Sequence, residues 1–175
     1  QTTGLDSNFY GNYVKRNGHN FFSSLNDILK EKKKYDIILS LSELEHKLNP
    51  DLFLKSLKKI LKKNGYLVLR IPNYFNIYKF LLGDNFLRYD YRSSHNYYFS
   101  EKNLDLLFSK LNFKTIKKIG MNEYSFNHLF TYLKTKKRVS SNKVINFFNQ
   151  KYDNDLVFNV EKNMISTSLL YILSY

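Results

Sequence analysis

Residues 35–73 limit the folds open to this chain more than any other stretch. They contain two short apolar segments, residues 35–40 and 66–71, of the kind that forms strands buried on both faces of a sheet. Between these segments, apolar residues recur at helical spacing with lysines on the opposite face. The apolar positions are Leu52, Phe53, Leu57, Ile60 and Leu61. Pro50 lies at the expected helix start and Gly65 just past its end. Two buried strands joined by a crossover helix predict a right-handed, parallel βαβ unit.

Further elements are expected on both sides of this unit. Before it, the pattern predicts short strands at residues 1–6 and 19–22 and helices at residues 9–16 and 25–33. After it come a helix at 100–111 with Ser100 as its cap, a strand at 113–119, helices at 122–134 and 142–150, and a last strand at 166–174. Alternating strands and helices predict an α/β fold, and the length favours a single domain over residues 1–175.

Several ordered blocks of the sequence resemble one enzyme family. The blocks are LSELEH after the first buried segment, LKKNG at the helix end, YLVLRIPN in the second buried segment, and HNYYFS from His95 onward. Over most of residues 5–119 they are similar to class I S-adenosylmethionine-dependent methyltransferases. The resemblance implies a Rossmann-like, doubly wound, mostly parallel sheet of strand order 3-2-1-4-5-7-6 with an antiparallel last strand. It also implies S-adenosylmethionine as the cofactor.

The glycine-rich cofactor turn of that family does not occur in this sequence. In such folds a carboxylate ends the second strand, about 20 residues after the turn, and binds ribose hydroxyls. Asp6 fits this carboxylate, although it would also fit a helix cap. The turn and the first strand would then precede Gln1. Because the chain begins with Gln rather than Met, upstream residues are expected; the alternative is a shortened relative that packs differently.

Four further residues are assigned to the cofactor site by the resemblance. Ser23 follows the second expected strand, where the family often has an acidic residue that meets the adenine amino group. A hydroxyl can accept the same hydrogen bond, but Ser23 or Ser24 would equally cap the next helix. Ser40, Leu41 and Ser42 lie where the strand at 35–40 ends, at the sheet edge where open α/β folds bind ligands. The resemblance places Leu41 and Ser42 near the transferable methyl group.

Two histidines, His95 and His46, are candidate catalytic bases toward a hydroxyl acceptor, because imidazole titrates near neutral pH. Each has a structural alternative as a hydrogen-bonding residue of a loop. Glu43, Glu45 and His46 together resemble the Glu-x-x-Glu-His metal loop of some methyltransferases of RNA 3′ ends. Since Ser42 occupies the first Glu position of that spacing, the ligand set is incomplete and no metal site is predicted.

The composition of the chain limits the kinds of partner and compartment to expect. The net charge of +13 favours an anionic partner such as nucleic acid. Lysine supplies most of that charge, whereas arginine is the better phosphate ligand, so a solvated basic surface is the preferred interpretation. The chain has no cysteine, which excludes a disulfide scaffold and a thiolate metal site. It also has no apolar run of about 18 residues, so no membrane span is predicted, and a cytoplasmic location is expected.

These observations predict methyl transfer from S-adenosylmethionine to a small-molecule acceptor, with a sugar or a cell-surface precursor as the guess within that class. Two alternatives stay open. The missing glycine-rich turn would suit a non-catalytic, methyltransferase-like binding or assembly module. The positive charge, together with Glu45 and His46, would suit an RNA methyltransferase.

Overall fold

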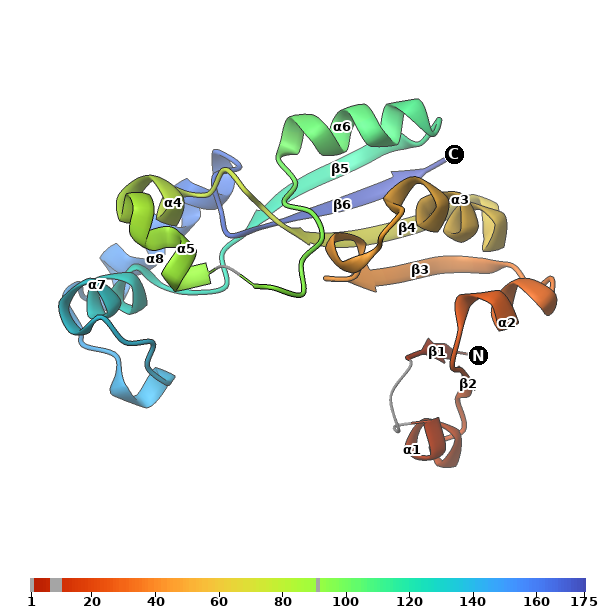
Figure 1. Ribbon diagram of the computed structural model, residues 1–175, viewed down its shortest axis with the longest axis horizontal. Coiled ribbons are helices and arrows are strands. Elements are labelled where there is room, and N and C mark those ends of the chain that lie inside the picture. Colours follow the sequence, from red (N-terminus) through yellow and green to blue (C-terminus); the bar gives the residue numbers. More distant parts are fainter. Residues whose placement is uncertain (1, 7–10, 91) are drawn as a thin grey trace.

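The computed structural model describes residues 2–6, 11–90 and 92–175 as two sheets with helices around them (Figure 1). A small parallel sheet pairs β1 (Thr3–Leu5) with β2 (Asn20–Phe22). The larger sheet has the strand order β3 (Tyr35–Leu41), β4 (Leu61–Pro72), β6 (Ser168–Ser174), β5 (Lys114–Met121). Strands β3 and β4 are parallel, and β6 is antiparallel to both of its neighbours.

This topology confirms the predicted fold class. The two sheets together follow the expected order 3-2-1-4-5-7-6 without its first strand. In the described part of the chain, no strand lies between β1 and β3, so the outer edge of β3 has no ladder partner there. The last strand runs antiparallel beside β5, as predicted.

Eight helices surround the sheets in the described residues. They are α1 (Gly11–Arg16), α2 (Leu25–Lys30), α3 (Pro50–Ile60), α4 (Ile77–Leu82), α5 (Phe86–Asp90), α6 (Glu101–Lys110), α7 (Phe126–Thr135) and α8 (Gln150–Lys162). Short 3-10 turns are η1 (Leu44–His46), η2 (Gly83–Asn85) and η3 (Ser141–Lys143). None of the helices so described is both long enough and apolar enough to cross a membrane.

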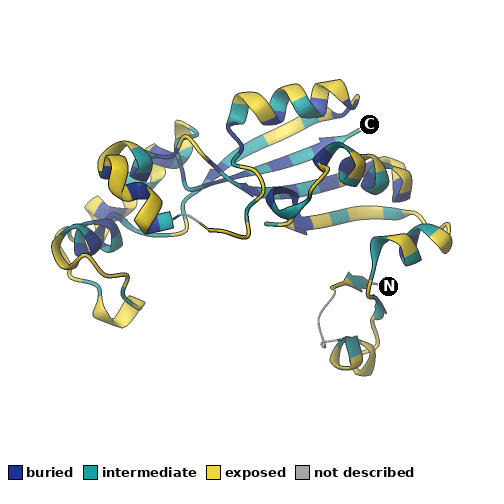
Figure 2. Cartoon of the chain, in the orientation of Figure 1, coloured by how far each residue is buried: buried dark blue, intermediate teal, exposed yellow. Residues whose placement is uncertain are grey.

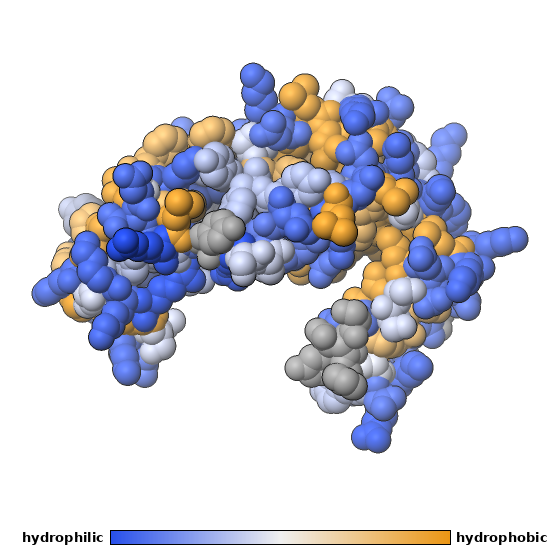
Figure 3. Space-filling model, in the orientation of Figure 1, coloured by the Kyte–Doolittle hydropathy of each residue, from blue (hydrophilic) through white to orange (hydrophobic). Residues whose placement is uncertain are grey.

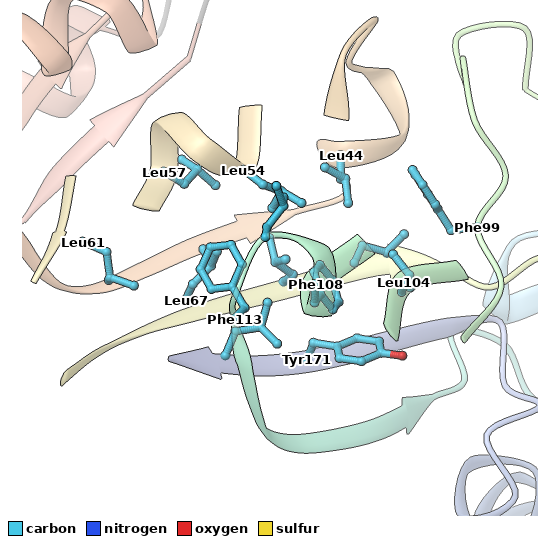
Figure 4. Close-up of a cluster of buried hydrophobic side chains, with 14 of the residues drawn as sticks. Leu44, Leu54, Leu57, Leu61, Leu67, Phe99, Leu104, Phe108, Phe113 and Tyr171 are labelled. Atoms are coloured by element: carbon cyan, nitrogen blue, oxygen red, sulfur yellow. The ribbon is translucent and has the colours of Figure 1, made fainter. Parts of the chain in front are cut away.

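The main core lies between the larger sheet and the helices α3 and α6 (Figure 4). The side chains of Leu54 and Leu57 reach it from α3, and Leu104 and Phe108 reach it from α6. The strands contribute Leu67, Leu69, Ile71, Leu169, Tyr171 and Leu173. Burial of these apolar side chains fixes which face of each helix meets the sheet.

The predicted α3 begins where expected but ends earlier. The Asn49 side chain accepts a hydrogen bond from the Leu52 backbone amide at 2.9 Å, which caps the helix before Pro50. Leu52 was expected in the buried stripe, but its side chain is exposed. The helix ends at Ile60, because Leu61 already pairs with β3.

A second apolar cluster joins α4, α5, α7 and α8. Its buried members are Tyr78, Leu82, Phe86, Tyr89, Phe126, Leu129, Tyr132 and Val160. The helix predicted at residues 142–150 is wrong. Here the buried Asn127 side chain accepts hydrogen bonds from the amides of Phe147 and Phe148, both at 2.9 Å. These amides therefore have partners without a helix, and α8 starts only at Gln150.

One face of the larger sheet carries apolar side chains that the described helices do not cover. Ile37, Leu39 and Leu41 are all more than half exposed. Figure 2 shows exposed positions along β3. Their neighbours on the opposite face, by contrast, turn toward the core. This exposed strand forms one wall of the candidate site.

Candidate functional site

A groove of about 1320 Å³ runs along β3, between the larger sheet and the β1–β2 segment (Figure 3). Four of the five predicted cofactor residues line it: Asp6, Ser23, Ser40 and Leu41. They lie at or just after the ends of β1, β2 and β3, and all three strand ends border this groove. The fifth, Ser42, lies outside this groove.

The structure distinguishes Ser23 from Ser24, either of which the sequence allowed as a helix cap or as a cofactor-site residue. The Ser24 hydroxyl accepts a hydrogen bond from the Asp27 amide at 3.2 Å and donates one to the Asp27 carboxylate at 2.6 Å. Ser24 therefore caps α2. Ser23 is exposed toward the groove instead.

Asp6 is exposed at the end of β1, while its backbone amide donates to the Phe22 carbonyl at 3.3 Å. Asp6 was alternatively expected to cap a helix over residues 9–16, and the expected start of that helix lies outside the described residues.

The groove residues fit the groups of S-adenosylmethionine. Asp6 carries an exposed carboxylate, the kind of group that can accept hydrogen bonds from hydroxyls, and Leu39 and Leu41 provide apolar surface. The Ser40 hydroxyl is buried and has no hydrogen-bond partner among the described residues. No glycine lines the groove in the described part of the chain.

A second, smaller cavity of about 170 Å³ opens beyond the end of β3. Ser42 lines it, with a left-handed backbone of φ 56°. The Ser42 amide donates to the Arg70 carbonyl at 2.8 Å, and its hydroxyl accepts from the Arg70 guanidinium at 2.9 Å. These contacts fix the turn that separates the two sites. Leu41 therefore lines the groove and Ser42 lines the cavity.

Both predicted catalytic histidines line the same cavity, together with Glu45. The rings of His46 and His95 meet edge to face, with centroids 4.8 Å apart. His46 Nε2 lies 4.0 Å from a carboxylate oxygen of Glu45. Burial raises the pKa of the Glu45 carboxyl above its ordinary value. Burial, followed by the charges of His46 and Arg92, lowers the pKa of His95.

Hydrogen bonds between two loops hold this group together. The Glu45 carbonyl accepts from the amides of Asn96 at 2.9 Å and Tyr97 at 3.2 Å. The Asn96 side chain donates to the His46 carbonyl at 2.8 Å. His46 Nδ1 lies 2.8 Å from the Ser94 carbonyl. The loop that carries His95 is thus fastened to the turn that carries Glu45 and His46.

The sequence analysis missed the rest of the cavity wall. Its remaining members are Arg70, Pro72, Tyr78, Tyr89, Asp90, Arg92, Glu123, Tyr124, Thr167 and Ser168. A charged residue inside the apolar segment 66–71 was the available signal for Arg70. The Ser168 hydroxyl donates to Glu123 at 2.8 Å, which positions that carboxylate at the cavity. Burial raises the pKa of Tyr89 to about 12, so its phenol stays protonated at neutral pH.

Comparison with known proteins supports one class. Residues 1–118 match the model of a family described as a methyltransferase domain, and the chain belongs to that family. A curated relative, the ubiquinone biosynthesis O-methyltransferase of Pelagibacter ubique (strain HTCC1062), is 43% identical over 47 residues. That match covers 27% of this chain and only 20% of the relative.

Solved structures show the same fold. A SAM-dependent methyltransferase from Archaeoglobus fulgidus matches with a TM-score of 0.59 at 19% identity, covering 100% of this chain and 76% of that chain. A SAM-dependent methyltransferase from Thermotoga maritima matches with a TM-score of 0.61 at 15% identity, covering 99% and 72%. The predicted family and Rossmann-like fold are therefore confirmed, and the comparisons support S-adenosylmethionine as the cofactor.

Proposed function

We propose that this protein transfers a methyl group from S-adenosylmethionine, bound in the groove, to a hydroxyl of a small molecule bound in the cavity. One observation carries the proposal: two consecutive residues at the end of β3, Leu41 and Ser42, line the groove and the cavity respectively. A donor and an acceptor held in these two sites would be brought into contact, which supplies most of what methyl transfer needs. The curated relative is named as an O-methyltransferase, which supports oxygen as the acceptor atom.

Each group of the chain has a separate task in this proposal. Asp6 and Ser23 hold the nucleoside end of the cofactor, and Ser40 and Leu41 hold the end nearer to β3. When bound, S-adenosylmethionine supplies the methyl group, whose carbon–sulfur bond breaks as the acceptor oxygen bonds to the carbon. The acceptor proton leaves toward the imidazoles of His95 or His46 and then to water. A lowered pKa keeps His95 neutral and able to accept that proton.

Calorimetric titration of S-adenosylhomocysteine tests the groove. Full-length protein should bind it, and Asp6→Asn should weaken binding by roughly 10- to 100-fold, because a hydrogen bond to a charged acceptor contributes about 1.5–3 kcal/mol. Asp84→Asn is the matched control, since Asp84 is exposed in η2 and lines neither site. It should bind as the unaltered protein does.

Two outcomes would overturn parts of the proposal. Equal binding by Asp6→Asn and the unaltered protein would remove Asp6 from the cofactor site. Absence of binding by the full-length protein would overturn methyl transfer and favour a non-catalytic binding module.

If binding is confirmed, acceptors are sought by transfer of labelled methyl groups to sugars and to phenols, with RNA included as the comparison. Labelling of RNA alone would exclude a small-molecule acceptor.

A further inference from the structure

The carboxylate of Glu45 is buried in an unusual way. The residue is 1% exposed, and neither carboxylate oxygen has a hydrogen-bond partner among the described residues. Taking a carboxylate out of water without a hydrogen bond or counter-charge is costly, so buried carboxylates are normally paired or bind a metal. The nearest cationic candidate, His46, lies at 4.0 Å, beyond hydrogen-bond distance. Glu45 therefore lines the cavity without a hydrogen-bond partner for either carboxylate oxygen among the described residues.

Two imidazole nitrogens lie beside these oxygens. His46 donates its Nδ1 hydrogen to the Ser94 carbonyl at 2.8 Å, which leaves the lone pair on Nε2, the atom nearer to Glu45. A histidine held in this way by a backbone carbonyl is the usual arrangement for a metal ligand. His95 Nδ1 is buried and has no partner among the described residues. One ligand atom from each of the three residues lies within 4.8 Å of the other two.

We propose that Glu45, His46 and His95 bind a divalent transition-metal cation such as Zn²⁺ or Mn²⁺. Two imidazoles and one carboxylate are a donor set that such ions prefer over Ca²⁺ or Mg²⁺. Metal–ligand bonds of about 2.0–2.2 Å place the ligand atoms roughly 3–4 Å from one another. Side-chain rotations that move these atoms by about 1 Å would bring all three within bonding distance of one ion. The adjoining cavity leaves room for further ligands.

The sequence could not reveal this site. It showed Glu45 and His46 with Ser42 in place of a further acid, and two ligands are too few. The missing ligand is His95, which arrives on a loop that is far away in sequence. The backbone bonds from Asn96 and Tyr97 to the Glu45 carbonyl hold it in place. A preformed set of this kind requires little rearrangement to take up an ion.

The role of the ion rests on the proposed function, whereas its binding does not. A cation in the cavity would bind the acceptor hydroxyl and lower its pKa, so that the oxygen attacks as an alkoxide or phenoxide. The hydroxyl proton would pass to water. In that case His46 and His95 act as ligands rather than as bases.

Titration of ZnCl₂ and MnCl₂ into metal-stripped, full-length protein tests the site directly. We expect one ion per chain, with affinity lowered at least tenfold by Glu45→Gln and by His95→Gln. His128→Gln is the matched control, because His128 lies in α7, bonded to Ser125, and does not line the cavity. It should bind as the unaltered protein does. Thermal unfolding gives a second measurement: the ion should raise the melting temperature of the unaltered protein but not of the two cavity variants.

The result that overturns the inference is the lack of saturable, one-to-one binding by the unaltered protein. Undiminished binding by both cavity variants would overturn it as well.

Titration of S-adenosylhomocysteine in the presence of a chelator separates this inference from the proposed function. Cofactor binding without metal binding removes the metal site alone. Metal binding without cofactor binding leaves the metal site standing and removes methyl transfer.

Discussion

At the scale of single residues, the Asn73 side chain shapes the wall behind the cavity. It is buried at the end of β4, directly after the cavity residue Pro72. Its amide nitrogen donates to the carbonyls of Phe75, Met164 and Ser166 at 3.0–3.2 Å. Its side-chain oxygen accepts from the Phe75 amide at 3.1 Å. One side chain thus ties β4 to the segment that leads into β6.

Asn73→Ala should therefore lower the free energy of unfolding by about 2–3 kcal/mol, because it takes the donor away from one buried carbonyl and two part-buried ones. Urea unfolding followed by circular dichroism measures the change. The control is Asn154→Ala, which removes an exposed hydrogen bond from Gln150 and should change stability by no more than about 0.5 kcal/mol. A loss in Asn73→Ala no larger than in the control would show that the buried network is not stabilising.

At the scale of elements, α8 packs unusually close to β5. A Cβ atom added to Gly120 would lie 2.8 Å from the Cα atom of Glu161, so backbone meets backbone there. The Glu161 carboxylate also accepts from the Asn122 amide at 2.8 Å, which binds the helix to the strand end. Since backbone atoms cannot rotate aside, a larger residue must push the helix away.

Gly120→Ala should accordingly destabilise the protein by about 1–3 kcal/mol, the usual range for overpacking. Thermal or urea unfolding provides the measurement. Gly4→Ala in β1 serves as the comparison, because the atoms nearest to its added Cβ lie at 3.6 Å or beyond, an ordinary contact distance. Equal stability of the two variants would contradict the close approach of α8 to β5.

The elements also show what the sequence could and could not predict. Local signals sufficed for the βαβ unit, since apolar runs, Pro50 and the cap positions act within a few residues. They failed at residues 142–150, where the side chain of the distant Asn127 supplies the hydrogen bonds. The same limit applies to the candidate site. His46 and His95 were each identified, but only the contacts between their loops bring both to Glu45.

At the scale of the whole molecule, the two sheets differ in how much they bury. Strands β4 and β6 have ladder partners on both sides and supply the fully buried Leu67, Leu69 and Tyr171. Strands β1 and β2 have three residues each, and neither they nor α1 contain a fully buried residue among those described. Two-stranded sheets of this length are marginally stable in water. One side of the groove therefore belongs to a part of the described chain that is held by little burial.

Hydrogen exchange should reveal the difference in stability between the two sheets and the effect of a ligand on it. Amides of β4 and β6 should exchange at the rate of global unfolding, whereas those of β1 and β2 should exchange orders of magnitude faster through local opening. Saturating S-adenosylhomocysteine should slow exchange in β1 and β2, because a ligand that contacts Asp6 and Ser23 would stabilise the folded form of this segment. Mass spectrometry of peptides from both sheets measures the two effects, with α7 as the internal reference, since no residue of that helix lines the groove. Protection of β1 and β2 that equals that of β6 without ligand would contradict this picture. A ligand effect confined to β6 would place the cofactor elsewhere.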